Sequence, residues 1–294
     1  MKKNVEQIKI ILEETIETYK DNPVDLLNID ASKIEYNHIN NMKFTYLRTI
    51  YDIVSYYNQH NIYNFNNMKV LELGAFLGVV SICLAKLGFQ VTSSDVPEFL
   101  NNKNILKRYK ENNIEYLPVN LKRYKLPLDA SNYDVVIMCE TLEHLNFNPL
   151  PMFLEINRIL KTQGILYLSL PNIADFHNRR VLLQGRSIHN PIKDFFAQLD
   201  KSHMINGIHW REYTMGEIKE MLEKLGFAVK QQYFFSSLER KPFFELNWKQ
   251  LILKIITDLI PTLKENITTI ALKIKYPDLN FYFCDANSSD VDVS

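Results

Sequence analysis

The sequence predicts an α/β fold built on a doubly wound, mostly parallel, seven-stranded sheet. Three observations support this. An apolar run at residues 69–73 passes through a glycine turn directly into a helical pattern at residues 79–87. Short apolar runs then alternate with helical patterns along the chain, as is typical of parallel strands joined by crossover helices. Polar residues follow several of these runs, at strand ends where open α/β sheets bind ligands.

The elements follow from the spacing of apolar residues. Residues 5–19 and 42–58 have helical spacing, so residues 1–65 are predicted to be an N-terminal helical lead-in. Strands are predicted at residues 69–73, 90–94, 115–119, 133–139, 165–170, 227–235 and 267–275. Helices are predicted between them at residues 79–87, 99–112, 152–160, 214–225 and 248–260. The first five strands are expected to be parallel.

The chain is predicted to have three parts: the lead-in, one domain and a tail. Residues 66–283 are predicted to form one domain. Within it, residues 173–212 are a long insertion after the fifth strand, expected to be a lid over a substrate. Residues 284–294 are small, polar and acidic, and are predicted to be disordered.

Composition narrows the classes of function. Thirty-four basic residues balance thirty-four acidic ones, so neither nucleic acid nor a membrane is an expected partner. Cys83, Cys139 and Cys284 are far apart and are interpreted as buried thiols in a reducing compartment. Residues 1–20 are predicted to form an amphipathic helix rather than a signal peptide, and the apolar residues 251–260 are too short to span a bilayer. We expect a cytoplasmic protein.

The glycine turn is the first candidate ligand site. Glu72, Gly74 and Gly78 give the pattern E-x-G-x-x-x-G. Glycines let the backbone approach a ligand closely, and the helix N-terminus that follows offers unpaired N–H groups. Asp95 ends the second strand, where a carboxylate can bind both ribose hydroxyls of a nucleoside. Asn120 follows the third strand and either binds an adenine amino group or is a simple turn residue.

Further motifs carry a family resemblance. Residues 126–145 read LPLDASNYDVVIMCETLEHL, and residues 158–164 read RILKTQG. Together with the glycine turn they resemble motifs of class I S-adenosylmethionine (SAM) dependent methyltransferases, in order and spacing. The usual glycine motif there is E/D-x-G-x-G-x-G, and Phe76 replaces its middle glycine. The resemblance covers residues 66–235 and implies a Rossmann-like methyltransferase fold, SAM as methyl donor and S-adenosylhomocysteine as product.

The resemblance also assigns cofactor contacts to the carboxyl ends of the first four strands. The residues expected to bind SAM are Glu72, Gly74, Ala75, Phe76 and Gly78 near its methionine part, Asp95 at the ribose, Asn120 and Leu121 at the adenine, and Cys139 and Glu140 after the fourth strand.

Glu140, Glu143 and His144 form an E-x-x-E-H pattern and are the predicted catalytic residues. If a helix begins after Cys139, their side chains share one face. The pattern resembles the metal-binding segment of ubiquinone-biosynthesis O-methyltransferases and of small-RNA 2′-O-methyltransferases, where a further histidine follows strand five, as His209 does here. The resemblance implies that these four residues hold a divalent ion. Two alternatives stay open: His144 as a metal-free general base, and purely structural roles.

The insertion indicates the chemistry of the acceptor. Residues 173–193 carry four basic residues against one acidic residue, a local excess of three positive charges. Guanidinium groups bind phosphate or carboxylate oxygens bidentately, although ordinary solvated charges would give the same pattern. The predicted substrate-binding residues are Arg179, Arg180, Arg186, His209 and Tyr213.

The leading hypothesis is a SAM-dependent methyltransferase acting on an O or N atom of a small, anionic, carbohydrate-related acceptor. A phosphorylated or nucleotide-linked sugar fits, because the chain is similar to bacterial methyltransferases that decorate building blocks of capsule and surface polysaccharide. Two alternatives remain: an RNA 2′-O-methyltransferase that uses the E-x-x-E-H pattern, and a non-catalytic SAM-binding module. The sequence leaves the oligomeric state open.

Overall fold

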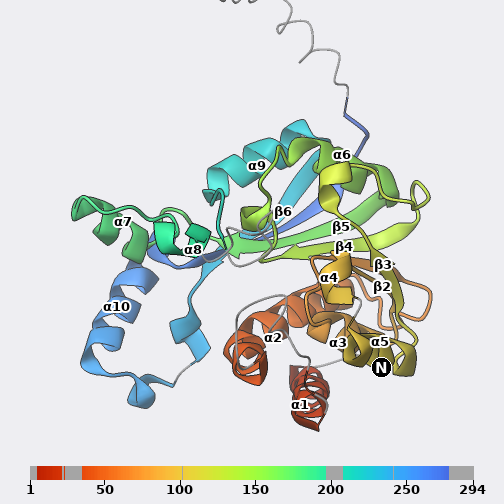
Figure 1. Ribbon diagram of the computed structural model, residues 1–294, viewed down its shortest axis with the longest axis horizontal. Helices are drawn as coiled ribbons and strands as arrows, with labels where there is room; N and C mark the ends of the chain where they lie inside the picture. Colours follow the sequence, from red (N-terminus) through yellow and green to blue (C-terminus); the bar gives the residue numbers. More distant parts are fainter. Residues whose placement is uncertain are drawn as a thin grey trace, which may run out of the picture.

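A seven-stranded sheet forms the centre of the molecule (Figure 1). The computed structural model describes residues 5–277 except for residues 22, 24–34, 101, 197–207 and 241. The strands are β1 (Lys69–Leu73), β2 (Gln90–Asp95), β3 (Glu115–Pro118), β4 (Tyr133–Cys139), β5 (Leu160–Pro171), β6 (Phe227–Phe235) and β7 (Asn266–Lys273), in the order β3-β2-β1-β4-β5-β7-β6.

The pairing confirms the predicted fold class. β1 to β5 are parallel, with Leu71 of β1 opposite Thr92 of β2 on one side and Val136 of β4 on the other. β7 is antiparallel to both β5 and β6. The order reverses at β1 and β4, and their carboxyl ends are the switch point where such sheets bind ligands.

Helices cover both faces of the sheet (Figure 1). On one side lie α1 (Val5–Asp21), α2 (Glu35–Gln59), α3 (Val79–Lys86), α4 (Pro97–Leu100) and α5 (Lys103–Glu111), and on the other α6 (Leu150–Ile159) and α9 (Met215–Lys224). The helix expected at residues 99–112 is divided, because the Asn102 side chain accepts hydrogen bonds from the N–H groups of Asn104 and Ile105 and so caps a new helix.

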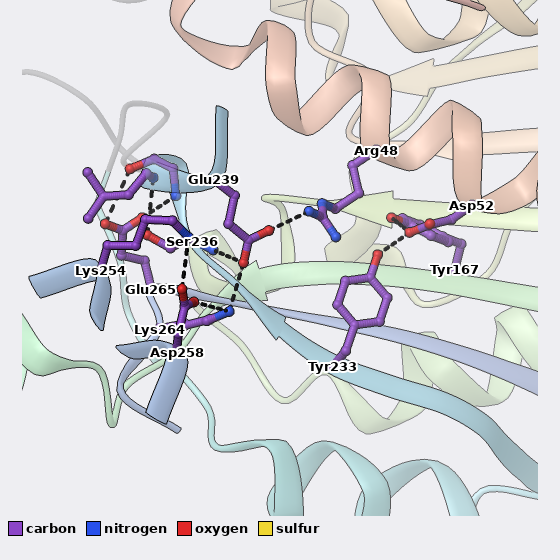
Figure 2. A network of polar contacts seen from close by, with 12 residues as sticks. Arg48, Asp52, Tyr167, Tyr233, Ser236, Glu239, Lys254, Asp258, Lys264 and Glu265 are labelled. Carbon is purple, nitrogen blue, oxygen red and sulfur yellow. Dashed lines mark hydrogen bonds and ion pairs between the residues drawn. The ribbon is translucent and has the colours of Figure 1, made fainter. Parts of the chain in front are cut away.

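The lead-in helices belong to the main hydrophobic core. Leu12 and Ile16 of α1 and Ile50 and Ile53 of α2 are fully buried in one cluster with Val70 of β1. α2 also crosses towards the far strands, where the carboxylate of Asp52 accepts hydrogen bonds from the hydroxyls of Tyr167 and Tyr233 (Figure 2). α2 is thereby fixed against the sheet beside the carboxyl ends of its strands.

A further group of helices lies to one side of the sheet (Figure 1). It comprises α7 (Phe176–Leu183) and α8 (Ile192–Phe196) of the insertion, and α10 (Trp248–Leu259). Short 3₁₀ helices are η1 (Leu121–Arg123), η2 (Leu142–His144), η3 (Ser237–Arg240), η4 (Phe243–Glu245) and η5 (Pro261–Leu263).

The cysteines, the C-terminal tail and the predicted absence of a membrane span can be compared with the structure in part. Cys83 is a buried free thiol and Cys139 a half-buried one. Cys284 and the tail at residues 284–294 lie outside the described residues. Among the described helices, none combines the length and the apolar character needed to cross a bilayer.

Candidate functional site

The loop between β1 and α3 requires glycine at two positions. Gly74 and Gly78 have φ angles of 71° and 77°. A Cβ atom at Gly74 would lie 2.1 Å from Oγ1 of Thr141, and one at Gly78 would lie 2.4 Å from the ring of Tyr109. Neither contact is physically tolerable, so both backbone conformation and space select glycine. Phe76, with φ 48°, also lies in the left-handed region, and its ring contacts His38 of α2 at 5.4 Å between centroids.

The loop is fastened to the end of β2. The N–H groups of Gly74 and Ala75 both donate to the carbonyl of Ser94, at 2.9 and 3.0 Å. The N–H of Phe76 donates to Oδ2 of Asp95 at 2.6 Å. Oδ1 of Asp95 accepts from the N–H of Val96 at 2.7 Å. Because a carboxylate has about four acceptor positions, Asp95 can in addition accept from a ligand hydroxyl. This places Asp95 beside the loop, as a shared nucleoside site requires.

Glu72 is buried beneath the loop. Its Oε2 accepts a 2.5 Å hydrogen bond from the hydroxyl of Ser81, in the first turn of α3. Burial raises the pKa of Glu72 to about 7, and the Ser81 hydrogen bonds oppose that rise. Glu72 therefore ties β1 to α3 and fixes the shape of the turn between them.

The backbone after β4 differs from the expected helix. Glu140 has a φ of 47°, and only the single 3₁₀ turn η2 follows. The carbonyl of Ser169 in β5 accepts from the N–H of Glu140 at 2.8 Å, and the Ser169 hydroxyl donates to Oε1 of Glu140 at 3.2 Å. Pairing with β5 thus continues past Cys139, so the expectation that Glu140, Glu143 and His144 share one face of an α-helix is wrong.

Three of the four expected metal ligands nevertheless converge. One ligand atom each of Glu143, His144 and His209 lie within 4.8 Å of one another; Glu140 is not part of this group. Nδ1 of His144 lies 3.1 Å from the carbonyl of Ile208, and Nδ1 of His209 lies 2.7 Å from Oε1 of Glu212. Each histidine is held through Nδ1, which leaves its Nε2 as the atom for a ligand, the usual arrangement of metal-binding histidines.

The electrostatics of this group are unusual. The Glu143 side chain is 1% exposed, and neither of its carboxylate oxygens has a hydrogen-bond partner among the described residues. Burial raises the pKa of Glu143 well above its ordinary value and lowers that of His144. Burial also raises the pKa of Glu140 to about 7, opposed by the Ser169 hydrogen bond and by His209. A buried carboxylate without a partner is costly, and a cation beside two imidazoles would satisfy it.

The methyltransferase domain family matches residues 45–232 of this chain, from α2 to β6. The chain belongs to the methyltransferase domain family. Family and sheet topology together identify it as a class I SAM-dependent methyltransferase, and the resemblance seen over residues 66–235 is confirmed. SAM is accordingly its cofactor.

A ubiquinone biosynthesis O-methyltransferase of Rickettsia akari is 29% identical over 137 residues, covering 46% of this chain and 51% of that protein. The chain therefore matches about half the length of this curated relative.

Two solved structures share the fold. One is the Haloferax volcanii complex between the Trm112 methyltransferase activator and a methyltransferase, with a TM-score of 0.52, 17% identity, and coverage of 81% of this chain and 93% of that one. The other is the PH0226 protein of Pyrococcus horikoshii OT3, with a TM-score of 0.52, 17% identity, and coverage of 87% and 98%. At this identity both support the fold alone.

Asn120 and Leu121, the residues expected at the adenine, follow the end of β3. The Asn120 side-chain oxygen accepts from the N–H of Lys122 at 3.0 Å and caps η1, as a turn residue does. Leu121 is half-buried against the second core cluster. An adenine contact through the exposed Asn120 amide stays a prediction.

The predicted substrate residues do not gather at one point. Arg179 donates to the carbonyl of Ala174 at 2.7 Å and lines a cavity of about 460 Å³ with Lys219. Arg180 lines a different cavity of about 160 Å³ between α7 and α10, and Arg186 is exposed. Tyr213 is buried in the core cluster beside α9. Only His209 lies in the group around Glu143.

Two residues at the site were missed by the sequence reasoning. Glu212 orients His209 through a hydrogen bond. The spacing of three residues between them in the sequence could have indicated this contact. Tyr46 of α2 is partly buried. Burial raises the pKa of its hydroxyl, and the nearby acidic groups of Glu72, Glu140 and Cys139 raise it further. Thr49, one turn later, lies 3.7 Å from the sulfur of Cys139. Tyr46 precedes every motif, so no sequence signal identified it.

Proposed function

We propose that this methyltransferase transfers the methyl group of SAM to an oxygen of a small acceptor and releases S-adenosylhomocysteine. The observation that carries the proposal is the group formed by Glu143, His144 and His209 after β4. In the class I fold the donor methyl lies near the carboxyl end of β4. Transfer to a hydroxyl needs both in-line alignment and removal of a proton, and this group can accept that proton.

His144 is suited to be the base. Its Nδ1 hydrogen bond to the carbonyl of Ile208 fixes the tautomer and leaves Nε2 able to accept a proton. The lowered pKa keeps the imidazole neutral near neutral pH. Glu143 Oε1 lies 3.8 Å from Nε2, and the Glu143 carboxyl can stabilise the imidazolium when it is ionised. A positioned base of this kind contributes roughly 10²- to 10⁴-fold to a rate.

The alternative to a metal-free base is a divalent cation bound by the same three residues. Glu143, His144 and His209 would hold it, and it would supply a positive charge that lowers the pKa of an acceptor hydroxyl. Nε2 of His144 cannot serve as metal ligand and as base at once. Chelator sensitivity therefore separates the two proposals.

The acceptor class rests on the insertion. Arg179, Arg180 and Arg186 of α7 and its flank are exposed and basic, which favours an anionic acceptor such as a phosphorylated or nucleotide-linked sugar. Enzymes that make such building blocks of surface polysaccharide work on cytoplasmic pools, so we propose a cytoplasmic location. The Rickettsia relative, named for ubiquinone biosynthesis, supports a second candidate, an aromatic-ring hydroxyl.

The test is methyl transfer from labelled SAM to acceptor panels. The panels contain nucleotide-linked sugars, phosphorylated sugars, catechols and short RNA oligonucleotides, with product mass as readout. We expect label in a sugar pool. Label only in catechol would favour the second candidate, and label only in RNA would favour the 2′-O-methyltransferase alternative. SAM binding without transfer to any panel would indicate a binding module.

Two variants sharpen the assignment of the base. His144→Gln should lower kcat by at least about a hundredfold while SAM affinity stays unchanged. The matched control is His189→Gln, because His189 is an exposed histidine of the insertion. Wild-type turnover in His144→Gln would reject the base role.

A further inference from the structure

α10 exposes a row of large apolar side chains. Trp248, Ile252, Ile255 and Leu259 are 68%, 49%, 48% and 78% exposed. Their spacing of i, i+4, i+7 and i+11 puts them in one stripe along the helix. A surface helix normally buries such a stripe. The only buried residue of α10 is Thr257, a polar one.

Ion pairs connect α10 to the segments beside it (Figure 2). Nζ of Lys254 and Nζ of Lys264 contact the carboxylate of Asp258 at 2.9 and 3.2 Å. Lys264 also contacts Glu239 at 2.9 Å, and Glu239 contacts Arg48 of α2 at 2.7 Å. The network links α10 to the core through η3 and α2. Rolling α10 to bury its stripe would break the contact between Asp258 and Lys264, so this ion pair favours the outward orientation of the stripe.

The stripe is part of a larger exposed apolar surface. The cavity of about 160 Å³ is lined by Phe176 and Arg180 of α7 and by Leu253 and Thr257 of α10, so the two helices are neighbours. The other exposed large apolar side chains of this region are Leu182 and Leu183 of α7, Ile192 and Phe196 of α8, and Phe243 and Phe244 of η4. Together with the stripe we call these residues the lobe surface. Large apolar side chains that gather in one exposed region of a protein mark a site of interaction.

Charge distinguishes between the partners that such a surface can bind. Residues 176–196 carry four basic and one acidic residue, and residues 242–264 carry three basic and two acidic, seven against three in all. Lys254 and Lys264 are only 13% exposed and pair with Asp258 and Glu239. The rest of the lobe carries five basic and two acidic residues, an excess of three positive charges in a chain with no net charge. A second copy of the chain would bring like charges together. An anionic bilayer offers both complementary charge and an apolar interior.

We propose that the lobe surface docks the methyltransferase peripherally on an anionic lipid bilayer, with Trp248 and Leu259 entering the interfacial region. Trp, Phe and Leu side chains beside Lys and Arg are the composition that binds at a membrane surface without spanning it. The earlier expectation of no membrane partner rested on the neutral charge of the whole chain. The structure concentrates positive charge and apolar side chains in one lobe.

Fluorescence of Trp248 provides the first test. The chain has two tryptophans, so Trp210→Phe leaves Trp248 as the reporter. This variant is titrated with vesicles of phosphatidylcholine alone and with equimolar phosphatidylcholine and phosphatidylglycerol. We expect a blue shift and co-sedimentation with the anionic vesicles only, weakened by added salt. Equal binding to both vesicles, or binding to neither, would overturn the proposal.

Substitutions locate the contact. Leu259→Gln should weaken binding to the anionic vesicles by at least about tenfold, because the transfer of one leucine side chain from water into the bilayer is lost. Lys193→Gln and Lys249→Gln should each weaken it by about fivefold. Tyr116→Gln is the matched control, since Tyr116 is 53% exposed but lies on β3 at the opposite edge of the sheet.

The alternative partner for the lobe surface is a second copy of the chain, and the oligomeric state tests it. Size-exclusion chromatography with light scattering should give a monomer for both the wild type and Leu259→Gln in the absence of lipid. A wild-type dimer that Leu259→Gln dissociates would show that a second copy covers the lobe surface, and would overturn the proposal.

Discussion

The N–H of Phe76 donates a 2.6 Å hydrogen bond to Oδ2 of Asp95. Phe76 replaces the middle glycine of the family motif, and Asp95 is the residue expected to bind ribose. A phenylalanine at φ 48° is strained, because left-handed backbone costs an L-residue about 1–2 kcal/mol. The hydrogen bond to Asp95 and the ring contact with His38 offset that cost. Asp95 therefore shapes the loop, and its contact with the ribose of SAM stays a prediction.

Asp95→Ala should weaken SAM binding by roughly ten- to a hundredfold, because a charge-assisted hydrogen bond to the loop and a ribose acceptor are both lost. Asp95→Asn keeps an oxygen that can accept from the N–H of Phe76, and should bind SAM with intermediate affinity. Titration calorimetry measures both. Asp129→Ala, at an exposed aspartate, is the control. SAM affinity unchanged in Asp95→Ala would show that Asp95 is only a loop residue.

Gly74→Ala should abolish SAM binding and destabilise the fold, since its Cβ would meet Thr141 Oγ1 at 2.1 Å. Gly185→Ala is a matched control for backbone strain: its φ is 68°, and nothing lies within 4 Å of an added Cβ. That control should cost only about 1 kcal/mol of unfolding free energy. The double variant Gly74→Ala with Thr141→Ala should recover part of the loss in a urea unfolding experiment. Equal costs for the two single variants would argue against the close approach.

Local pattern predicts the strands of this fold well. The bounds expected for β1, β4 and β6 agree with the structure, because each is an apolar run closed by turn residues. The turn after β4 was predicted wrongly because distant partners decide it. Ser169 pairs with Glu140, and the N–H of Trp210 donates to the carbonyl of Glu143 at 2.7 Å, across 29 and 67 residues of sequence.

The orientation of α10 has a similar explanation. Its apolar spacing predicts a helix, and ordinary helices turn the apolar side inward. Here Lys264, beyond the helix, binds Asp258 of α10, and Glu239, before the helix, binds Lys264. Such pairings between separate segments cannot be read from periodicity.

Tyr46→Phe should lower kcat/KM for methyl transfer by about tenfold while leaving thermal stability unchanged. The Tyr46 hydroxyl makes no hydrogen bond with the described residues and faces Glu72 and Glu140, so its loss removes a group available to a ligand rather than a structural contact. Tyr51→Phe, at an exposed tyrosine of the same helix, is the control. Lower stability with unchanged kinetics would assign Tyr46 to the core instead.

Glu212→Gln should weaken binding of a divalent ion by roughly ten- to a hundredfold, because Glu212 orients His209 through its Nδ1. Calorimetric titration with Mn²⁺ or Zn²⁺ measures the affinity without reference to activity. The control is Glu220→Gln, whose carboxylate pairs with Lys224 at the surface. If the wild type binds neither ion, the metal proposal falls and the base role of His144 remains.

The unfolding free energy should fall as pH rises from about 4.5 to about 7. Glu72 has a pKa raised from 4.5 to about 7 by burial, and so has Glu140. A carboxyl whose pKa is higher in the folded than in the unfolded state favours folding fully below about pH 4.5, and that contribution is lost as pH rises through the folded pKa. The loss amounts to about 3 kcal/mol for each carboxyl at most.

Glu72→Gln, whose amide oxygen can still accept from Ser81, should therefore be less sensitive to pH between 4.5 and 8 than the wild type. It should also be the more stable protein at pH 8. The double variant with Glu140→Gln should be flatter still, because both buried carboxyls contribute with the same sign. Urea unfolding at several pH values tests this, with Glu220→Gln as the exposed control. Parallel pH profiles for all four proteins would show that the two carboxyls ionise with little cost, and hence that solvent or a bound cation reaches them in the folded protein.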